Sequence, residues 1–152
     1  FGHQVSVGYY AQEHDNLDPE ASLIDHMRRS APVGLGLTET QLRGMLGMFG
    51  LSGSKVFQES ATLSGGEKTK LALAMLMIGR NNLLLLDEPT NNLDPPSRQA
   101  VADALASWKG AIVLVSHDTE FVEQLAPTKV LLMPDGQVDY FSAEWLEIVN
   151  LA

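Results

Sequence analysis

Two adjacent carboxylates, Asp87 and Glu88, directly follow the wholly apolar run 83–86. Four leucines bounded by polar residues predict a strand that is covered on both faces of a parallel sheet. At the end of such a strand Asp87 can hold Mg²⁺, and Glu88 can polarise a water molecule for attack on a phosphate. The same pattern allows a purely structural role, in which both carboxylates cap the turn 89–92.

A histidine follows a second apolar run, which predicts another buried strand at 111–115. Ligands of open parallel sheets lie at the carboxyl ends of the strands. We therefore expect His117 on the same edge of the sheet as Asp87 and Glu88. A lone histidine at a strand end is more often structural than catalytic, and that alternative stays open.

The segment 63–67, with the sequence LSGGE, precedes a helical run at 68–78. Ser64 and Glu67 have the spacing of a capping box, in which each side chain accepts a backbone amide at the helix start. Two glycines in a first helical turn cost up to about 1 kcal/mol each relative to alanine. They suit a backbone that approaches a ligand closely, and the free amides of a helix start suit a phosphate.

The 152 residues contain no segment with the pattern of a phosphate-binding P-loop. Gly47, Gly50 and Gly53 precede Lys55, but a P-loop needs Gly-Lys-Ser/Thr and Val56 follows this lysine. We interpret Gly50 and Gly53 as helix-ending and turn residues, and expect these residues alone to lack a complete phosphate site.

The elements that position these residues follow an α/β pattern. The predicted order is a strand at 5–9, helices at 20–29 and 39–49, the helix at 68–78, the strand at 83–86, a helix at 94–108, the strand at 111–115, a helix at 119–126, a hairpin of 129–133 with 138–141 around Asp135-Gly136, and a last helix after Ser142. We expect residues 18–62 to form a mainly helical subdomain.

Composition excludes several classes of function. The net charge of −9 and the scattered basic residues argue against nucleic-acid binding by this surface alone. Without cysteine there is no disulfide and no thiolate metal site. The longest apolar run, 71–78, is far shorter than a membrane span. The residues from Phe1 do not have the pattern of a signal peptide, and a signal upstream of Phe1 stays open. Since the chain begins at Phe1, we expect it to be part of a longer protein.

Taken in order, five motifs resemble the Q-loop, signature, Walker B, D-loop and H-switch of ATP-binding cassette (ABC) ATPases. They are Gln12, 63–67, 83–88, 91–94 and 116–118. The chain departs from the family in lacking the Walker A segment and the adenine-stacking aromatic residue. The resemblance implies one incomplete ABC domain over 1–152, with a P-loop NTPase-like (RecA-like) parallel-sheet core, a helical subdomain and a C-terminal hairpin. Residues 1–17 and 63–152 would form its core and signature region.

The resemblance also implies roles for the matching residues. Asp87 would support Mg²⁺, Glu88 would orient the attacking water, and Gln12 and His117 would sense the metal and the γ-phosphate. The signature would contact ATP held by the opposite cassette of a head-to-tail sandwich, and Asp94 would help to link the two sites. The implied cofactor-binding residues are Gln12, Ser64, Gly65, Gly66, Glu67 and Asp94.

The residues after the signature narrow the resemblance. At position 67 transport cassettes usually have Gln, whereas this chain has Glu. This residue resembles the ABC-F proteins, and so do the run 68–74 and the motifs at 90–94 and 116–118. These are soluble, cytoplasmic tandem-cassette ATPases, many of which act on ribosomes, and residues 25–32 resemble their second cassette. The implied function lies in translation or antibiotic resistance, with ribosome contacts outside this chain and no membrane insertion. The alternatives are a transporter motor and a non-catalytic dimerisation module.

Overall fold

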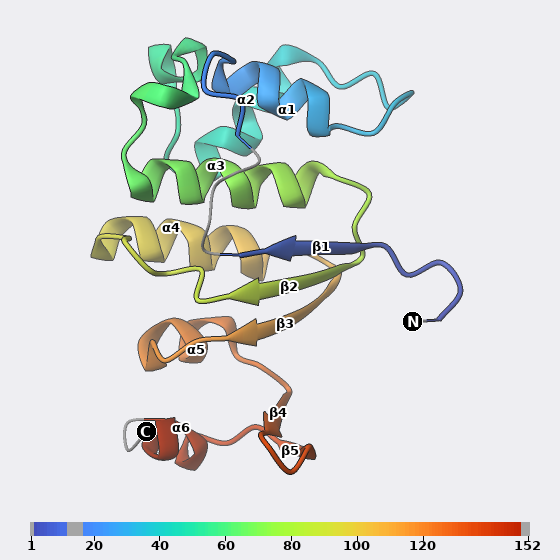
Figure 1. The fold of residues 1–152 in the computed structure, drawn as a ribbon, viewed down its shortest axis with the longest axis vertical. Helices are drawn as coiled ribbons and strands as arrows, with labels where there is room; N and C mark the ends of the chain where they lie inside the picture. The colour runs from blue at the N-terminus through green and yellow to red at the C-terminus, as the bar shows by residue number, and fades with distance from the viewer. Residues whose placement is uncertain (1, 12–16, 150–152) are drawn as a thin grey trace.

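The computed structural model of the chain describes residues 2–11 and 17–149. Three strands form a parallel sheet in the order β1-β2-β3, with bounds Val7–Tyr10 for β1, Leu83–Asp87 for β2 and Ala111–Val115 for β3. In the register of the sheet Tyr10 pairs with Leu86, and Asp87 pairs with Val115. The carboxyl ends of the strands therefore lie at one edge (Figure 1), as expected for an α/β sheet.

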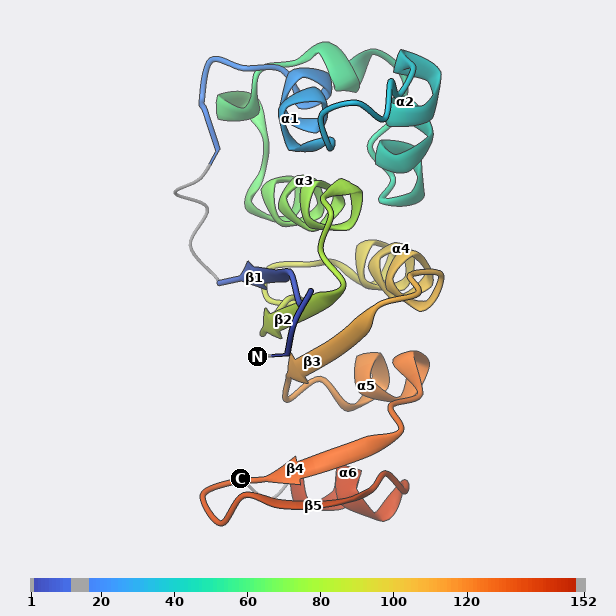
Figure 2. The same ribbon diagram turned by 90° about the vertical axis from the view of Figure 1, so that its right-hand side faces the viewer.

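Three helices lie on one face of the parallel sheet (Figure 2). They are α3 (Gly65–Ile78), α4 (Pro95–Ala106) and α5 (Thr119–Leu125). A second helical layer packs against α3, and it consists of α1 (Leu23–Ser30), α2 (Glu39–Met48) and two 3₁₀ helices, η1 (Gly53–Phe57) and η2 (Ser60–Thr62). The expected helical segment between β1 and α3 is thus present, and the 3₁₀ helices within it were not predicted.

The core lies between these helical layers and the covered face of the sheet. Leu84 and Leu86 of β2 are buried in one cluster with Leu71 and Leu73 of α3 and Leu23 of α1. Burial of each leucine side chain stabilises the fold by about 1.5–3 kcal/mol. This cluster fixes the glycine-rich start of α3 relative to the carboxylates that end β2.

The opposite face of the sheet is largely uncovered in the part of the chain that the structure describes. We expected burial on both faces of 83–86 and a buried strand at 111–115, and for β3 this prediction is wrong. Val113 and Val115 are 49% and 57% exposed, and Tyr9 of β1 is 59% exposed. Helices α3, α4 and α5 lie on the other side (Figure 2), so among the described residues these apolar strands lack the second layer that their composition indicates.

Side-chain caps set where the helices begin. The helix predicted from residue 20 starts at Leu23, because Ser22 Oγ accepts the amide of Asp25 at 3.2 Å. The helix predicted from residue 94 starts at Pro95, with Asp94 as its N-cap and proline in the first turn, where it is tolerated. The Asp94-Pro95 pattern thus located the start of α4, whereas the start of α1 lies three residues after the predicted one.

The C-terminal strands form a separate antiparallel hairpin, as predicted. The strands are β4 (Lys129–Leu132) and β5 (Gln137–Tyr140), and helix α6 (Glu144–Val149) follows them. The connection spans residues 133–136 and includes Gly136 at φ +69°, a conformation that glycine adopts without strain. None of the helices among residues 2–11 and 17–149 is long and apolar enough to cross a membrane.

Candidate functional site

Glu88 and His117 meet at the carboxyl edge of the sheet. Glu88 leaves β2 with a positive φ of 48°, and its amide donates to the carbonyl of Val115 at 2.8 Å. Positive φ is uncommon outside glycine and is often found at functional sites. His117 Nδ1 lies 2.8 Å from Glu88 Oε1, and the side chains are 72% and 22% exposed, respectively. The two residues thus share one edge, as the strand order predicts.

The two carboxylate oxygens of Glu88 differ in their surroundings. Glu88 Oε2 is buried and has no hydrogen-bond partner among the residues that the structure describes. A buried polar atom left in this state costs about 1–3 kcal/mol. Access of a water molecule to this oxygen requires a local rearrangement, because the atom is closed to solvent in this structure. The capping role that we left open for Glu88 explains neither side-chain oxygen, because Oε1 pairs with His117 and Oε2 has no partner among the described residues.

Asp87 is the next carboxylate along β2 and is exposed at the strand end. Among residues 2–11 and 17–149, no group of three or more His, Cys, Asp and Glu side chains could hold a metal ion. One exposed carboxylate fits Mg²⁺, which usually binds one or two carboxylates together with water and phosphate oxygens. Gln12, the other predicted metal-sensing residue, lies outside the described residues.

The first turn of α3 has the predicted capping box. Ser64 Oγ accepts the amide of Glu67 at 3.3 Å, and Glu67 Oε2 accepts the amide of Ser64 at 3.0 Å. The other oxygen of this carboxylate pairs with Lys55 Nζ from η1. Lys55 therefore joins the helical layer to the start of α3, a role that the sequence did not reveal because we considered this lysine only as part of a P-loop.

The two signature glycines have different surroundings. A Cβ atom at Gly66 would lie 2.8 Å from the carbonyl oxygen of Asn92, so the turn after β2 requires glycine here. A Cβ atom at Gly65 would meet nothing within 4 Å. The packing of the chain therefore explains Gly66 but leaves Gly65 unexplained, and Gly65 faces open space at the helix start, where amides favour anions.

Asp94 ends the turn after β2 as the N-cap of α4. Its Oδ1 accepts the amide of Ser97 at 3.3 Å, and hydrogen bonding by Ser97 is the main cause that lowers the pKa of Asp94. Lys70 Nζ donates to Ser97 Oγ at 3.2 Å and so joins α3 to α4. The predicted linking residue thus lies where the signature helix and the turn meet.

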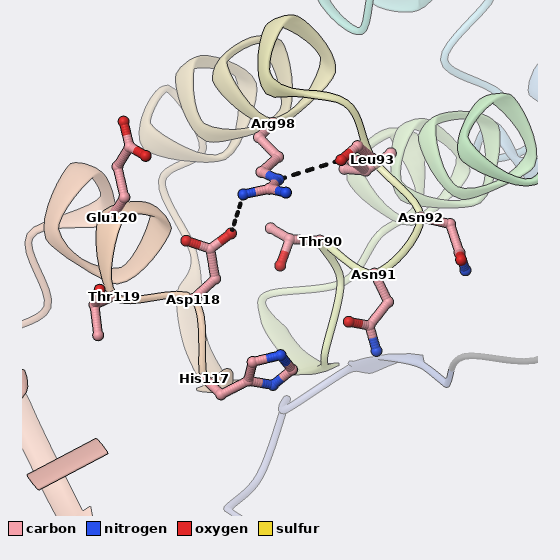
Figure 3. A pocket seen from close by; sticks show the side chains of 9 residues that line it. All are labelled: Thr90, Asn91, Asn92, Leu93, Arg98, His117, Asp118, Thr119 and Glu120. Atoms are coloured by element: carbon pink, nitrogen blue, oxygen red, sulfur yellow. Dashed lines mark hydrogen bonds and ion pairs between the residues drawn. The ribbon is translucent and has the colours of Figure 1, made fainter. Parts of the chain in front are cut away.

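A polar pocket of about 410 Å³ opens between this turn and the loop that carries His117 (Figure 3). Its walls are residues 90–93 and 117–120, and Arg98 of α4 lies between them. No sequence signal singled out Arg98, because its contacts come together only in the fold. The site therefore consists of the Glu88–His117 pair, the exposed start of α3 and the polar turn between them.

We predict that the stability of the first turn of α3 depends on pH through Glu67. Hydrogen bonding by Lys55 is the main cause that holds the pKa of Glu67 below its usual range. A lowered folded-state pKa gives a stabilisation that is complete above the unfolded pKa of about 4.3 and is lost as pH falls through the folded value. We expect protection of the amides of Glu67 and Lys68 against hydrogen exchange to fall across that acidic range.

The Glu67→Gln variant should have lower protection at neutral pH and little further change on acidification. The matched control is Glu59→Gln, which removes an exposed carboxylate outside the capping box. Protection factors measured by hydrogen exchange at pH 3 to 7 would check this. An acid-induced loss of protection that persists unchanged in Glu67→Gln would contradict the assignment.

Residues 3–91, more than half of the chain, match the family model described as "ABC transporter", and the chain belongs to this family of ATP-binding cassettes. Its relatives are ABC-F proteins. The chain is 43% identical over 141 residues to "Probable ATP-binding protein YheS" of Escherichia coli K12, covering 92% of the chain and 22% of that protein. It is 38% identical over 119 residues to mouse "ATP-binding cassette sub-family F member 3", covering 78% of the chain and 16% of the relative.

Solved structures show the same fold. The chain superposes with a TM-score of 0.70 and 18% identity on the dimeric structure of MJ0796, a bacterial ABC transporter cassette, covering 90% of the chain and 63% of that cassette. A second dimeric structure of MJ0796, bound to ADP and Pi in a post-hydrolysis state, gives a TM-score of 0.69. The chain thus has an α/β ABC cassette fold. The chain spans only about a fifth of the length of the ABC-F relatives.

Proposed function

We propose that residues 1–152 form one incomplete ATP-hydrolysing cassette of an ABC-F protein, with 18–62 as its helical subdomain. The observation that carries the ATPase proposal is the geometry of Glu88. One carboxylate oxygen pairs with His117, and the other is buried without a partner among the described residues. This arrangement fixes the orientation of the carboxylate and leaves one oxygen without a partner among the described residues. The proposed attacking water would pair with this oxygen after a local rearrangement exposes it.

In the proposed reaction Glu88 orients the attacking water and accepts its proton, while His117 holds the carboxylate and faces the γ-phosphate. Asp87 would hold Mg²⁺, together with phosphate oxygens and Gln12. When bound, Mg²⁺ neutralises charge on the phosphate oxygens. Because no P-loop is present in the 152 residues, we expect them to be inactive as an isolated fragment.

A second cassette, in the same chain or in a dimer, completes the proposed site. The start of α3 would contact ATP held by that cassette, and the open surroundings of Gly65 support this role. Asp94 would link this contact to the site of its own cassette. The residues proposed at this contact are Ser64, Gly65, Gly66 and Glu67.

The ABC-F relatives and the run that follows Glu67 support a cytoplasmic role in translation or ribosome-targeted antibiotic resistance. The resemblance of residues 25–32 supports assignment as the second cassette. The net charge of −9 favours ribosome contacts that come from regions outside these residues.

Ribosome binding that depends on ATP tests this function. With Glu88→Gln in this cassette and the equivalent change in the other, we expect the complete protein to sediment with ribosomes in ATP but not in ADP. Blocked hydrolysis prolongs the ATP-bridged state, and any partner that prefers this state is retained. Sucrose-gradient sedimentation with the two nucleotides measures the effect.

The alternatives give other outcomes in the same experiment. A protein that stays at the top of the gradient and fractionates with membranes would indicate a transporter motor, the role that the family description "ABC transporter" suggests. A complete protein that dimerises in ATP but never hydrolyses it would indicate a non-catalytic dimerisation module.

A further inference from the structure

Arg98, in the first turn of α4, contacts both walls of the polar pocket. Its Nε donates to the carbonyl oxygen of Leu93 at 3.2 Å, and its Nη1 donates to Asp118 Oδ2 at 3.2 Å (Figure 3). Leu93 lies in the turn that follows β2, and Asp118 directly follows His117. One guanidinium group therefore joins two loops that come from different strands of the sheet.

Both partners of Arg98 are held by further contacts. The Leu93 side chain is buried, and its amide donates to the carbonyl of Thr90 at 3.1 Å. Asp118 caps α5, since its Oδ1 accepts the amide of Phe121 at 3.1 Å, and this leaves Oδ2 for Arg98. The Asp118 side chain is 13% exposed and that of Arg98 is 41% exposed, so solvent reaches the ion pair mainly from the arginine side.

The chemistry of arginine suits this double contact. A guanidinium group has donors in fixed, divergent directions, whereas a lysine ammonium is a single charged point on a flexible chain. A donor at Nε directed at a carbonyl and a donor at Nη1 directed at a carboxylate fix the distance between the two loops. The turn that Arg98 contacts also packs against α3, because Gly66 lies close to the carbonyl of Asn92.

We propose that Arg98 is a positioning residue that couples the turn 90–93 to the loop that carries His117, so that displacement of one loop moves the other. Among the described residues Arg98 hydrogen-bonds to neither Glu88 nor the His117 ring, and it acts through the two loops. The proposal rests on the proposed ATPase function, in which the turn meets the signature helix and His117 faces the phosphate.

A double-mutant cycle in the complete protein tests the coupling. Arg98→Met removes both donors, and Asp118→Asn keeps an oxygen for the cap of α5 while it removes the charged partner. Each change should lower the turnover number for ATP by about 2-fold to 30-fold, the usual range for coupling residues, with KM changed less than about 2-fold. The double variant should be no slower than the slower single variant, because both changes remove one interaction.

Gln99→Met is the matched control. Gln99 is the next residue of α4, and it accepts a hydrogen bond from Gln124 of α5 at 3.0 Å, so it shares the α4–α5 interface without contacting either loop. Its turnover should equal that of the wild type, and Arg98→Lys should stay below the wild type because lysine cannot hold both acceptors. Additive effects of Arg98→Met and Asp118→Asn, or an equal loss in Gln99→Met, would overturn the proposal.

Hydrogen exchange separates failure of this proposal from failure of the proposed function. A complete wild-type protein without ATPase activity would overturn the function but would leave the coupling testable. Arg98→Met should then raise exchange by a similar factor at the amides of Leu93 and Phe121, one in each loop region, and Gln99→Met should not. Faster exchange at one amide only, or at neither, would show that Arg98 does not join the loops.

Discussion

In the complete protein, Glu88→Gln is expected to slow ATP hydrolysis by roughly 10²–10⁴-fold, the usual contribution of a positioned acid–base group. Glutamine has the size of glutamate and can still pair with His117 through its amide oxygen, but it cannot accept a proton from water. ATP binding should therefore be retained. Single-turnover hydrolysis and equilibrium binding of a fluorescent ATP analogue measure the two effects separately.

The control for Glu88→Gln is Glu123→Gln, which removes one exposed carboxylate from α5 and should leave the rate unchanged. His117→Ala adds a second comparison, since it removes the group that fixes Glu88 Oε1. An unchanged turnover number in Glu88→Gln would show that Glu88 has a structural role only.

The second large effect is expected at Gly65. In the complete protein, Gly65→Ala should lower ATP turnover by about 10²-fold, since a displacement of about 1 Å at a reacting group can cost that much. The new methyl group meets nothing within 4 Å in this chain, so the fold should be unaffected. Alanine even favours the helix by up to about 1 kcal/mol. ATPase assays together with thermal unfolding separate the two readouts.

Gly44→Ala is the matched control for this substitution. Gly44 is an exposed glycine within α2, and a Cβ atom there also meets nothing within 4 Å. Both variants should unfold at or slightly above the wild-type temperature, and only Gly65→Ala should lose activity. Wild-type turnover in Gly65→Ala would show that no ligand approaches the start of α3.

Most of the strands and helices could be predicted from local patterns of apolar and polar residues. Apolar runs located β2 and β3, and the polar residues Ser64 and Asp94 located helix starts. The burial of β3 was predicted wrongly, because the composition of a strand reflects every layer that it evolved to contact. The described residues supply only one of those layers.

For the site, sequence reasoning found the residues but not their geometry. The strand order placed His117 near Glu88, and the structure adds that the second oxygen of Glu88 is buried without a partner among the described residues. The different surroundings of Gly65 and Gly66 depend on the turn at Asn92, which is distant in sequence. For the same reason Arg98 had no sequence signal, since its two partners meet only after folding.

The open face of the sheet has a consequence for handling the molecule. Val113, Val115 and Tyr9 present apolar side chains on a sheet whose outer strands, β1 and β3, have no further strand beside them among the described residues. Unpaired backbone at a strand edge next to an apolar surface is a template for self-association. Residues 1–152 expressed alone should therefore form oligomers as their concentration rises.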